Sequence, residues 1–279
     1  MIKKFYSLIE NSSYYDKGIL IDCKPLVNDD AFCNEKYKII SNRLTPEEIK
    51  SLFGKRVYHN REFLVFWSLY ELNLIDRTLA KKRRNSYGVK YTDKHCCNHI
   101  PGKGNNPEKI VDKVHISLTG KKMSFSCVDV SKEDLEIYYE KIKEYSPIWM
   151  ELEEDFFNKL LEYICDNNLK IPSTIKYVEL KSKSINENNY SNYPFLVKRV
   201  LYNDVSLAYA YECTEGKFHL INELVYVELF EENGKQIALI SSLINKTFPI
   251  IRYPVENLEI KQNVRCACGC NNQVLILEV

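Results

Sequence analysis

The sequence predicts an α+β fold, with a helix-rich N-terminal half that contains a few strands and an antiparallel β-meander in the C-terminal half. Apolar residues recur at three- and four-residue steps in much of the first half, whereas they alternate with polar residues after Pro172. Asn233-Gly234 separates two of the alternating runs, and this dipeptide favours a two-residue hairpin turn. We therefore expect a helix-rich α+β region at 1–170 and an antiparallel β region at 171–279 that ends in a cysteine-rich segment.

Four helices are expected in the first half, because a capping residue marks each of four helix starts and an apolar stripe follows the last three. The stripe after the last cap runs from Ile148 to Ile164 at helical spacing and stops before Asn167-Asn168. Between the helices, alternation predicts extended chain at 113–130. The four expected helix starts are Thr45, Asn60, Ser131 and Ser146.

Strands are expected wherever apolar and polar residues alternate between turn signals in the second half. Turns are predicted at Asn203-Asp204, at Glu215-Gly216 and at Asn233-Gly234, because these residues tolerate positive φ or favour tight turns. Consecutive strands joined by short turns pair antiparallel. The expected strands lie within 175–184, 195–202, 205–213, 219–230 and 236–244.

Composition excludes some classes of function. The chain has 279 residues, of which 45% are hydrophobic, so it can bury a substantial core. Its 39 basic and 38 acidic residues give a net charge of +1, which excludes a global field that attracts nucleic acid or anionic lipid. No apolar stretch approaches the roughly 18 residues that span a bilayer, and the N-terminus lacks a signal-peptide pattern. We expect a cytoplasmic protein without a membrane partner.

The cysteines point to metal chemistry. A cytoplasm keeps thiols reduced, so clustered cysteines among the 10 in the chain favour a metal or redox site over disulfides. Cys266, Cys268 and Cys270 alternate around Gly269, which permits a tight turn. A second supply of ligands is the HCCNH segment, and we expect the two segments to share a structural Zn²⁺. The alternative is that these residues are ordinary thiols and surface histidines. The HCCNH candidates are His95, Cys96, Cys97 and His99.

The remaining cysteines are scattered through the sequence. They lack the spacing of a metal site, and an isolated cysteine is usually a small, buried, apolar residue. We therefore expect them in the core. They are Cys23, Cys33, Cys127, Cys165 and Cys213.

The segment VHISLTG contains a candidate catalytic histidine. His115-x-Ser117-Leu118 resembles one of the two H-x-[ST]-hydrophobic motifs of the 2H phosphoesterases. That resemblance implies His115 as an acid or base acting on a phosphodiester. The family requires a second motif, and His219 is followed by Leu220-Ile221 in place of the hydroxyl residue. A packed or solvated strand histidine is the alternative.

The segment YVELKSKS contains a candidate metal-dependent centre. Glu179 and Lys181 lie two residues apart, as in the E-x-K half of the PD-(D/E)xK nucleases, which the segment resembles. The resemblance implies a carboxylate that binds a metal and a lysine that orients water. The chain lacks the Pro-Asp pair of that family. A charged face on a half-buried strand explains the same pattern.

Two basic stretches are candidates for phosphate contact. One is a run of four cations at the end of an expected helix, and the other is the GKGNN loop. Solvated charges are the alternative for both. The residues are Lys81, Lys82, Arg83, Arg84 and Lys103.

No catalytic constellation is complete, so the sequence favours a binding protein over an enzyme. Its 20 Tyr and 12 Phe residues suit an interface as well as a core. We expect a zinc-stabilised α+β protein that binds a macromolecular partner, protein rather than nucleic acid, and that can self-associate. Its Lys-, Asn- and Ile-rich composition suggests a phage or mobile-element accessory factor that blocks or recruits a host complex. The alternative is a phosphodiester-cleaving enzyme that uses Glu179 with Lys181, or His115.

Overall fold

The fold comprises two compact units in a computed structural model. Unit 2 is formed by Leu74–Gly102 and Pro107–Val200, and unit 1 by Leu201–Val279 with Met1–Asn73 and Lys103–Asn106. The structure describes residues 57–59, 64–66, 80–90, 92–99, 114–119, 121–127, 130–185, 190–203, 208–245, 249–255, 258–261, 265–270 and 274–276.

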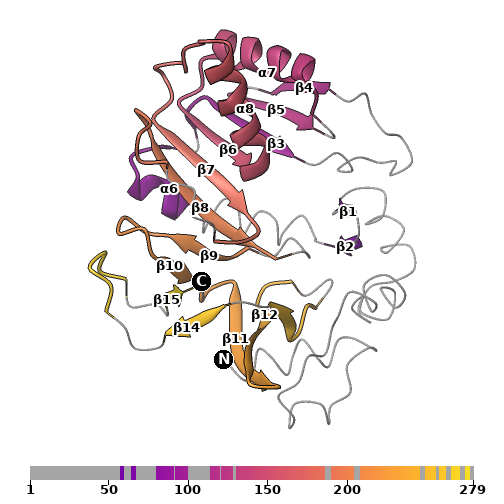
Figure 1. Ribbon diagram of the computed structural model, residues 1–279, viewed down its shortest axis with the longest axis vertical. Coiled ribbons are helices and arrows are strands. Elements are labelled where there is room, and N and C mark those ends of the chain that lie inside the picture. Colours follow the sequence, from indigo (N-terminus) through magenta and orange to yellow (C-terminus); the bar gives the residue numbers. More distant parts are fainter. Residues whose placement is uncertain are drawn as a thin grey trace. The chain divides into compact units, whose positions relative to one another are not determined.

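A mixed sheet forms the centre of unit 2 (Figure 1). Its strand order is β8-β7-β6-β3-β5-β4. The neighbours β7-β6, β6-β3 and β3-β5 pair parallel, whereas β4 is antiparallel to β5. The bounds are β3 His95–His99, β4 Val114–Thr119, β5 Lys122–Cys127, β6 Trp149–Glu153, β7 Tyr177–Ser182 and β8 Leu196–Tyr202.

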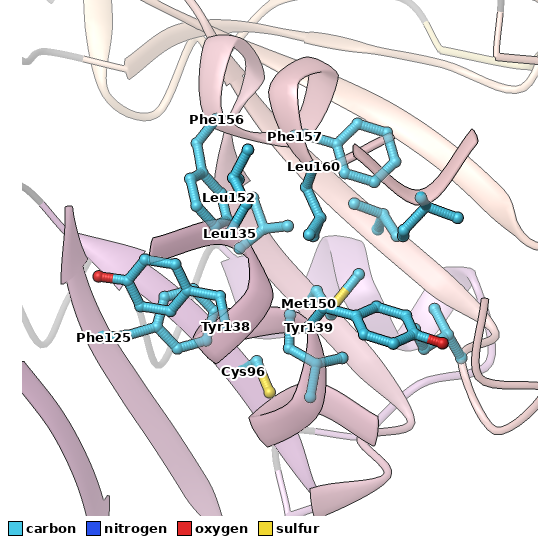
Figure 2. Close-up of a cluster of buried hydrophobic side chains, with 14 of the residues drawn as sticks. Cys96, Phe125, Leu135, Tyr138, Tyr139, Met150, Leu152, Phe156, Phe157 and Leu160 are labelled. Atoms are coloured by element: carbon cyan, nitrogen blue, oxygen red, sulfur yellow. The ribbon is translucent and has the colours of Figure 1, made fainter. Parts of the chain in front are cut away.

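Two helices pack against the sheet of unit 2 and form the core that Figure 2 shows. They are α7 (Lys132–Tyr145) and α8 (Glu154–Asp166). Each helix buries an apolar stripe, and alternate strand residues meet it from the sheet. The largest side chains at the centre make tilted and edge-on ring contacts, with centroids 4.9–5.8 Å apart. These rings are Phe125, Tyr138 and Phe156.

The predicted helix start at Ser131 is confirmed. Its side chain accepts a hydrogen bond from the Asp134 amide, and the Asp134 carboxylate accepts one from the Ser131 amide. The reciprocal pair satisfies two backbone donors that the first helical turn leaves without partners.

The predicted helix from Ser146 is wrong over its first turns. Residues Trp149–Glu153 form strand β6, and α8 begins at Glu154. A central strand of a parallel sheet is buried on both faces, so it does not show simple alternation. Trp149, Met150 and Leu152 are all buried, and in the sequence two of them continued the apolar stripe of α8. Periodicity alone could not separate the strand from the helix.

Unit 1 contains two antiparallel arrangements of strands. One has the order β9-β10-β15-β14 and the other β11-β12-β13. Asn233 and Gly234 have φ of 55° and 75°, as the predicted hairpin turn between β11 and β12 requires. The bounds are β9 Ala208–Glu212, β10 Phe218–Leu220, β11 Val225–Glu232, β12 Lys235–Ser242, β13 Tyr253–Val255, β14 Glu259–Lys261 and β15 Val274–Ile276.

The predicted fold class, with a helix-rich N-terminal half, is wrong. Strands dominate the part of the chain that the structure describes, where the helices are α6 (Lys81–Ser86), α7 and α8. Where a helix was expected after Asn60, β2 (Leu64–Phe66) pairs with β1 (Val57–His59). The helix expected from Thr45 lies outside the described residues. No described helix is both long and apolar enough to cross a membrane.

Candidate metal centre

Three cysteines and one histidine of unit 1 bring their ligand atoms together. Their sulfur and ring nitrogen atoms all lie within 4.8 Å of one another. Three of the four side chains are buried, and Cys268 is half-buried. Four convergent S and N donors could hold a metal ion. The residues are Cys213, His219, Cys266 and Cys268.

Two β-hairpins supply these ligands. Cys213 follows β9 at a turn where Gly216 has φ of 70°, and His219 lies in β10. Cys266 and Cys268 lie between β14 and β15, where Gly269 has φ of 80° and its amide donates to the Cys266 carbonyl. The hairpins are neighbours, because β10 pairs with β15. An ion at this place would therefore join β9-β10 to the C-terminal loop.

The distances fit a tetrahedral ion. A Zn–S bond of about 2.3 Å implies an S···S edge of about 3.8 Å and a slightly shorter S···N edge. The Cys213 and Cys266 sulfurs are 3.8 Å apart, and Cys268 Sγ is 3.4 Å from His219 Nε2. Four protein ligands fill a tetrahedral coordination sphere, which is the pattern of a structural rather than a catalytic site.

The two thiols of the C-terminal loop differ in acidity in the absence of an ion. The backbone amide of Cys268 lowers the pKa of the Cys266 thiol, whereas burial raises the pKa of Cys268 to about 12. A bound divalent ion would lower the pKa of both thiols, because metal coordination stabilises the thiolate. Metal uptake would then release protons.

The structure places the other predicted metal ligands as follows. Cys270 lies beside the cluster, with its sulfur 3.2 Å from the Tyr211 hydroxyl. His95, Cys96 and Cys97 lie in β3 of unit 2 and, within the described part of the chain, are not among the four grouped ligands. His99 ends β3, and its side chain lies outside the described part of the chain.

The three described β3 candidates have other partners. The His95 ring stacks on Trp149 at 4.3 Å, and burial lowers the pKa of His95. Burial raises the pKa of Cys96, which is fully enclosed in the core of unit 2. The Cys97 sulfur is 3.4 Å from the Ser124 hydroxyl.

Sequence analysis missed Cys213 and His219 as ligands. Cys213 was expected in the core; it is indeed buried, but its sulfur belongs to the metal-ligand group. His219 was weighed only as half of a phosphoesterase motif. The sequence does contain a signal for them, because Cys213 and His219 lie on either side of the predicted turn at Gly216. A hairpin brings the residues on its two strands close together. Cys165, also expected in the core, is exposed.

The candidate catalytic pair of β7 belongs to a buried charge network in unit 2. Glu179 accepts hydrogen bonds from both Arg83 and Arg84 and from the Tyr177 hydroxyl, at 2.8–3.2 Å. Arg84 also contacts Glu151 at 2.8 Å, and Lys181 contacts the other oxygen of Glu151 at 2.9 Å. The network therefore pairs its two carboxylates with three cations.

Burial and charge oppose each other in this network. Burial alone raises the pKa of each carboxyl, but the neighbouring cations outweigh it and hold the pKa values of Glu151 and Glu179 below the ordinary range. Burial lowers the pKa of Arg84, yet Glu179 and Glu151 raise it overall. The Arg84 guanidinium also lies 4.5 Å from the Trp149 ring centroid. The two carboxylates and the Arg84 guanidinium therefore keep each other in their charged forms.

The remaining predicted residues are placed less fully. Lys81 and Lys82 begin α6, and the Lys82 side chain lies outside the described part. His115 lies in β4 opposite Ser126, and its side chain is likewise outside it. Lys103 falls outside the described residues.

Comparisons with known proteins show similarity in fold alone. No protein-family model and no curated protein matches the chain. Solved structures of 2-hydroxyisobutyryl-CoA ligase match it. An open conformation with 2-HIB-AMP and CoA gives a TM-score of 0.61 at 10% identity over 88% of this chain and 60% of that one. A postadenylation state with R3-HIB-AMP gives a TM-score of 0.58 at 11% identity, over 85% of this chain and 52% of that one. The thioesterification state gives a TM-score of 0.55 at 12% identity, over 79% of this chain and 50% of that one.

These matches correct the predicted class of protein. The matching structures are CoA ligases and not interaction factors. The predictions of a macromolecule-binding accessory factor and of a phosphodiester-cleaving alternative are therefore wrong. This chain spans about half to three fifths of the length of the ligases it resembles.

Proposed function

We propose that this chain is a CoA-ligase-type protein that binds an acyl adenylate and is stabilised by a structural Zn²⁺. The observation that carries the first part is the likeness in fold to CoA ligases over 79–88% of the chain. Two of those ligase structures hold the acyl adenylate 2-HIB-AMP together with CoA. The low sequence identity leaves the acyl group of this chain's own ligand open.

The proposed reaction has two steps. A carboxylate attacks the α-phosphorus of ATP, which gives the acyl-AMP and releases pyrophosphate. The sulfur of CoA then attacks the acyl carbon, and AMP leaves as the thioester forms. Because the chain spans about half to three fifths of the ligases it resembles, binding of the acyl adenylate is the minimal activity that we assign to it.

An acyl-adenylate analogue tests this assignment directly. Isothermal titration of the metal-loaded protein with acyl-sulfamoyl adenosines, which cannot be hydrolysed, should show saturable binding to one site. A series of short acyl chains, with and without a 2-hydroxyl group, would rank the acyl group. Carboxylate-dependent exchange of pyrophosphate into ATP would extend the assignment to catalysis. Absence of binding across the series would contradict it.

The cluster of Cys213, His219, Cys266 and Cys268 supports the second part. Soft thiolate and imidazole donors select Zn²⁺ over Mg²⁺ or Ca²⁺, and a structural site needs four of them. The ion would fix the β9-β10 hairpin to the loop between β14 and β15. Its role is to stabilise unit 1, since no ligand position is left for water or substrate.

Elemental analysis of protein purified without a metal-affinity tag tests the zinc assignment. We expect one equivalent of zinc per chain, which is lost when Cys266 and Cys268 are both replaced by serine. Cys165→Ser is the matched control, because this thiol is exposed on α8 and lies in unit 2. A wild-type protein without stoichiometric metal, or equal zinc in all three proteins, would contradict the assignment.

A further inference from the structure

The metal cluster has one more sulfur beside it than a tetrahedral ion needs. Cys213, His219, Cys266 and Cys268 already provide four donors. The Cys270 backbone amide donates a hydrogen bond to Cys268 Sγ at 3.4 Å. Cys270 is therefore in direct contact with a candidate ligand without belonging to the four.

Solvent exposure separates the four cysteines of this region into two pairs. Cys213 and Cys266 are buried, with exposed fractions of 2% and 7%. Cys268 and Cys270 are both half-buried, so a small solute reaches them first. Oxidation of cysteine follows thiolate character and exposure, and metal coordination supplies the thiolate at Cys268.

The surroundings hold Cys270 next to Cys268. The Tyr211 hydroxyl lies 3.2 Å from Cys270 Sγ, and the Tyr211 ring packs 5.9 Å from the ring of His219. Gly269 stands between the two cysteines with φ of 80°, so the chain turns there. The turn therefore keeps the two cysteines near each other in the loop.

We propose that Cys268 and Cys270 form a hydroperoxide-sensitive dithiol that controls release of the metal. This inference rests on the proposed zinc site. The Cys268 thiolate attacks the O–O bond of a hydroperoxide, which forms a sulfenic acid and expels hydroxide or an alkoxide. The Cys270 thiol then attacks the Cys268 sulfur, which forms the disulfide and expels water. The two sulfurs together supply the two electrons that reduce the peroxide.

Metal release follows from this chemistry because a disulfide sulfur is a poor ligand. The ion is left with three protein donors and dissociates, and the β9-β10 hairpin loses its attachment to the C-terminal loop. A thiol reductant restores both thiols and hence the site. The zinc centre would thus be reversibly sensitive to oxidants, which a fully buried four-ligand site is not.

The experiment treats zinc-loaded wild-type protein and the Cys270→Ser variant with hydrogen peroxide in the presence of a chromophoric zinc chelator. Wild-type protein should release its zinc with loss of two thiols, and peptide mass spectrometry should find a Cys268–Cys270 disulfide. A thiol reductant followed by zinc should restore the full metal content. Cys270→Ser should load zinc normally, release it more slowly, and fail to recover, because its Cys268 proceeds to the sulfinic acid.

The possible outcomes separate the two proposals. Zinc-free untreated protein would contradict the zinc site itself. If zinc-loaded Cys270→Ser protein releases and recovers its metal as the wild type does, the dithiol proposal alone is contradicted. A disulfide between Cys213 and Cys266 would contradict it in the same way. Tyr211→Phe supplies a second variant that retains all five donors. Its zinc content should be normal, and its disulfide should form more slowly because Cys270 is held less firmly.

Discussion

Two buried polar clusters, one in each unit, are built in opposite ways. In unit 2, the carboxylates of Glu151 and Glu179 meet cationic side chains at 2.8–3.2 Å, so the protein itself supplies every charge. In unit 1, three sulfurs and a ring nitrogen converge with no protein cation among the four. Four such donors form the ligand set of a structural metal ion. We therefore expect the strands that carry the four ligands, but not the charge network of unit 2, to depend on a metal.

Removal of the metal should have the largest effect, and it should be confined to unit 1. Apparent binding energies of structural zinc are about 10 kcal/mol or more, so chelation should remove several kcal/mol of stability from the strands that carry the ligands. Hydrogen exchange of the β9 and β10 amides should accelerate by orders of magnitude, while β6 and β7 stay protected. If hydrogen exchange accelerated equally in both units, or did not accelerate in β9 and β10, the proposed difference between the two clusters would be contradicted.

Replacement of Glu179 by alanine should damage unit 2 and leave the metal in place. Arg84 would be left buried with a single carboxylate partner, and breaking a buried pair from one side costs about 3–5 kcal/mol. Urea unfolding should show this loss at unchanged zinc content. Glu144→Ala is the matched control, because its pair with Lys141 is exposed and should contribute little to stability. Similar effects of the two substitutions would show that the buried network is not a stabilising feature.

Acid should weaken unit 2 through the same carboxylates. The pKa values of Glu151 and Glu179 lie below the ordinary 4.5 in the folded protein, so their stabilising contribution is fully present above that pH. It is lost as the pH falls through the lower, folded values. Exchange protection of β6 and β7 should therefore decline below about pH 4.5, and decline less in Glu179→Ala. A Glu179→Ala protein with the wild-type pH profile would contradict this assignment.

The capping box of α7 should give the smallest effect and should touch neither polar cluster. Ser131→Ala removes one half of the reciprocal hydrogen bonds and should cost about 1 kcal/mol. Thermal unfolding measures the change, and Ser173→Ala, at an exposed position, is the control. A loss of zinc in Ser131→Ala protein would mean that the two units are less independent than proposed.

What the sequence could predict follows from how local each signal is. The start of α7 and the Asn233-Gly234 hairpin depend on a few adjacent residues, and both are confirmed. Strand β6 was missed because a strand that is buried on both faces resembles part of a helical stripe. That error contributed to the wrong prediction of a helix-rich first half.

For a similar reason, only two of the four ligands of the metal centre could be predicted from the sequence. Cys266 and Cys268 stand out because they alternate beside a glycine, which is a local pattern. Their partners Cys213 and His219 lie about fifty residues earlier, and only the pairing of β10 with β15 brings them near. Glu179 and Arg84 are likewise joined by the tertiary structure, which is why Glu179 resembled a nuclease residue in isolation.

X-ray absorption at the zinc edge is the decisive measurement of the metal site, because it reports the ligands of the ion in the untreated protein. We expect three sulfur ligands at about 2.3 Å and one nitrogen at about 2.0–2.1 Å, changing to two sulfurs in Cys213→Ser. A spectrum dominated by oxygen and nitrogen, or one that Cys213→Ser leaves unchanged, would contradict it.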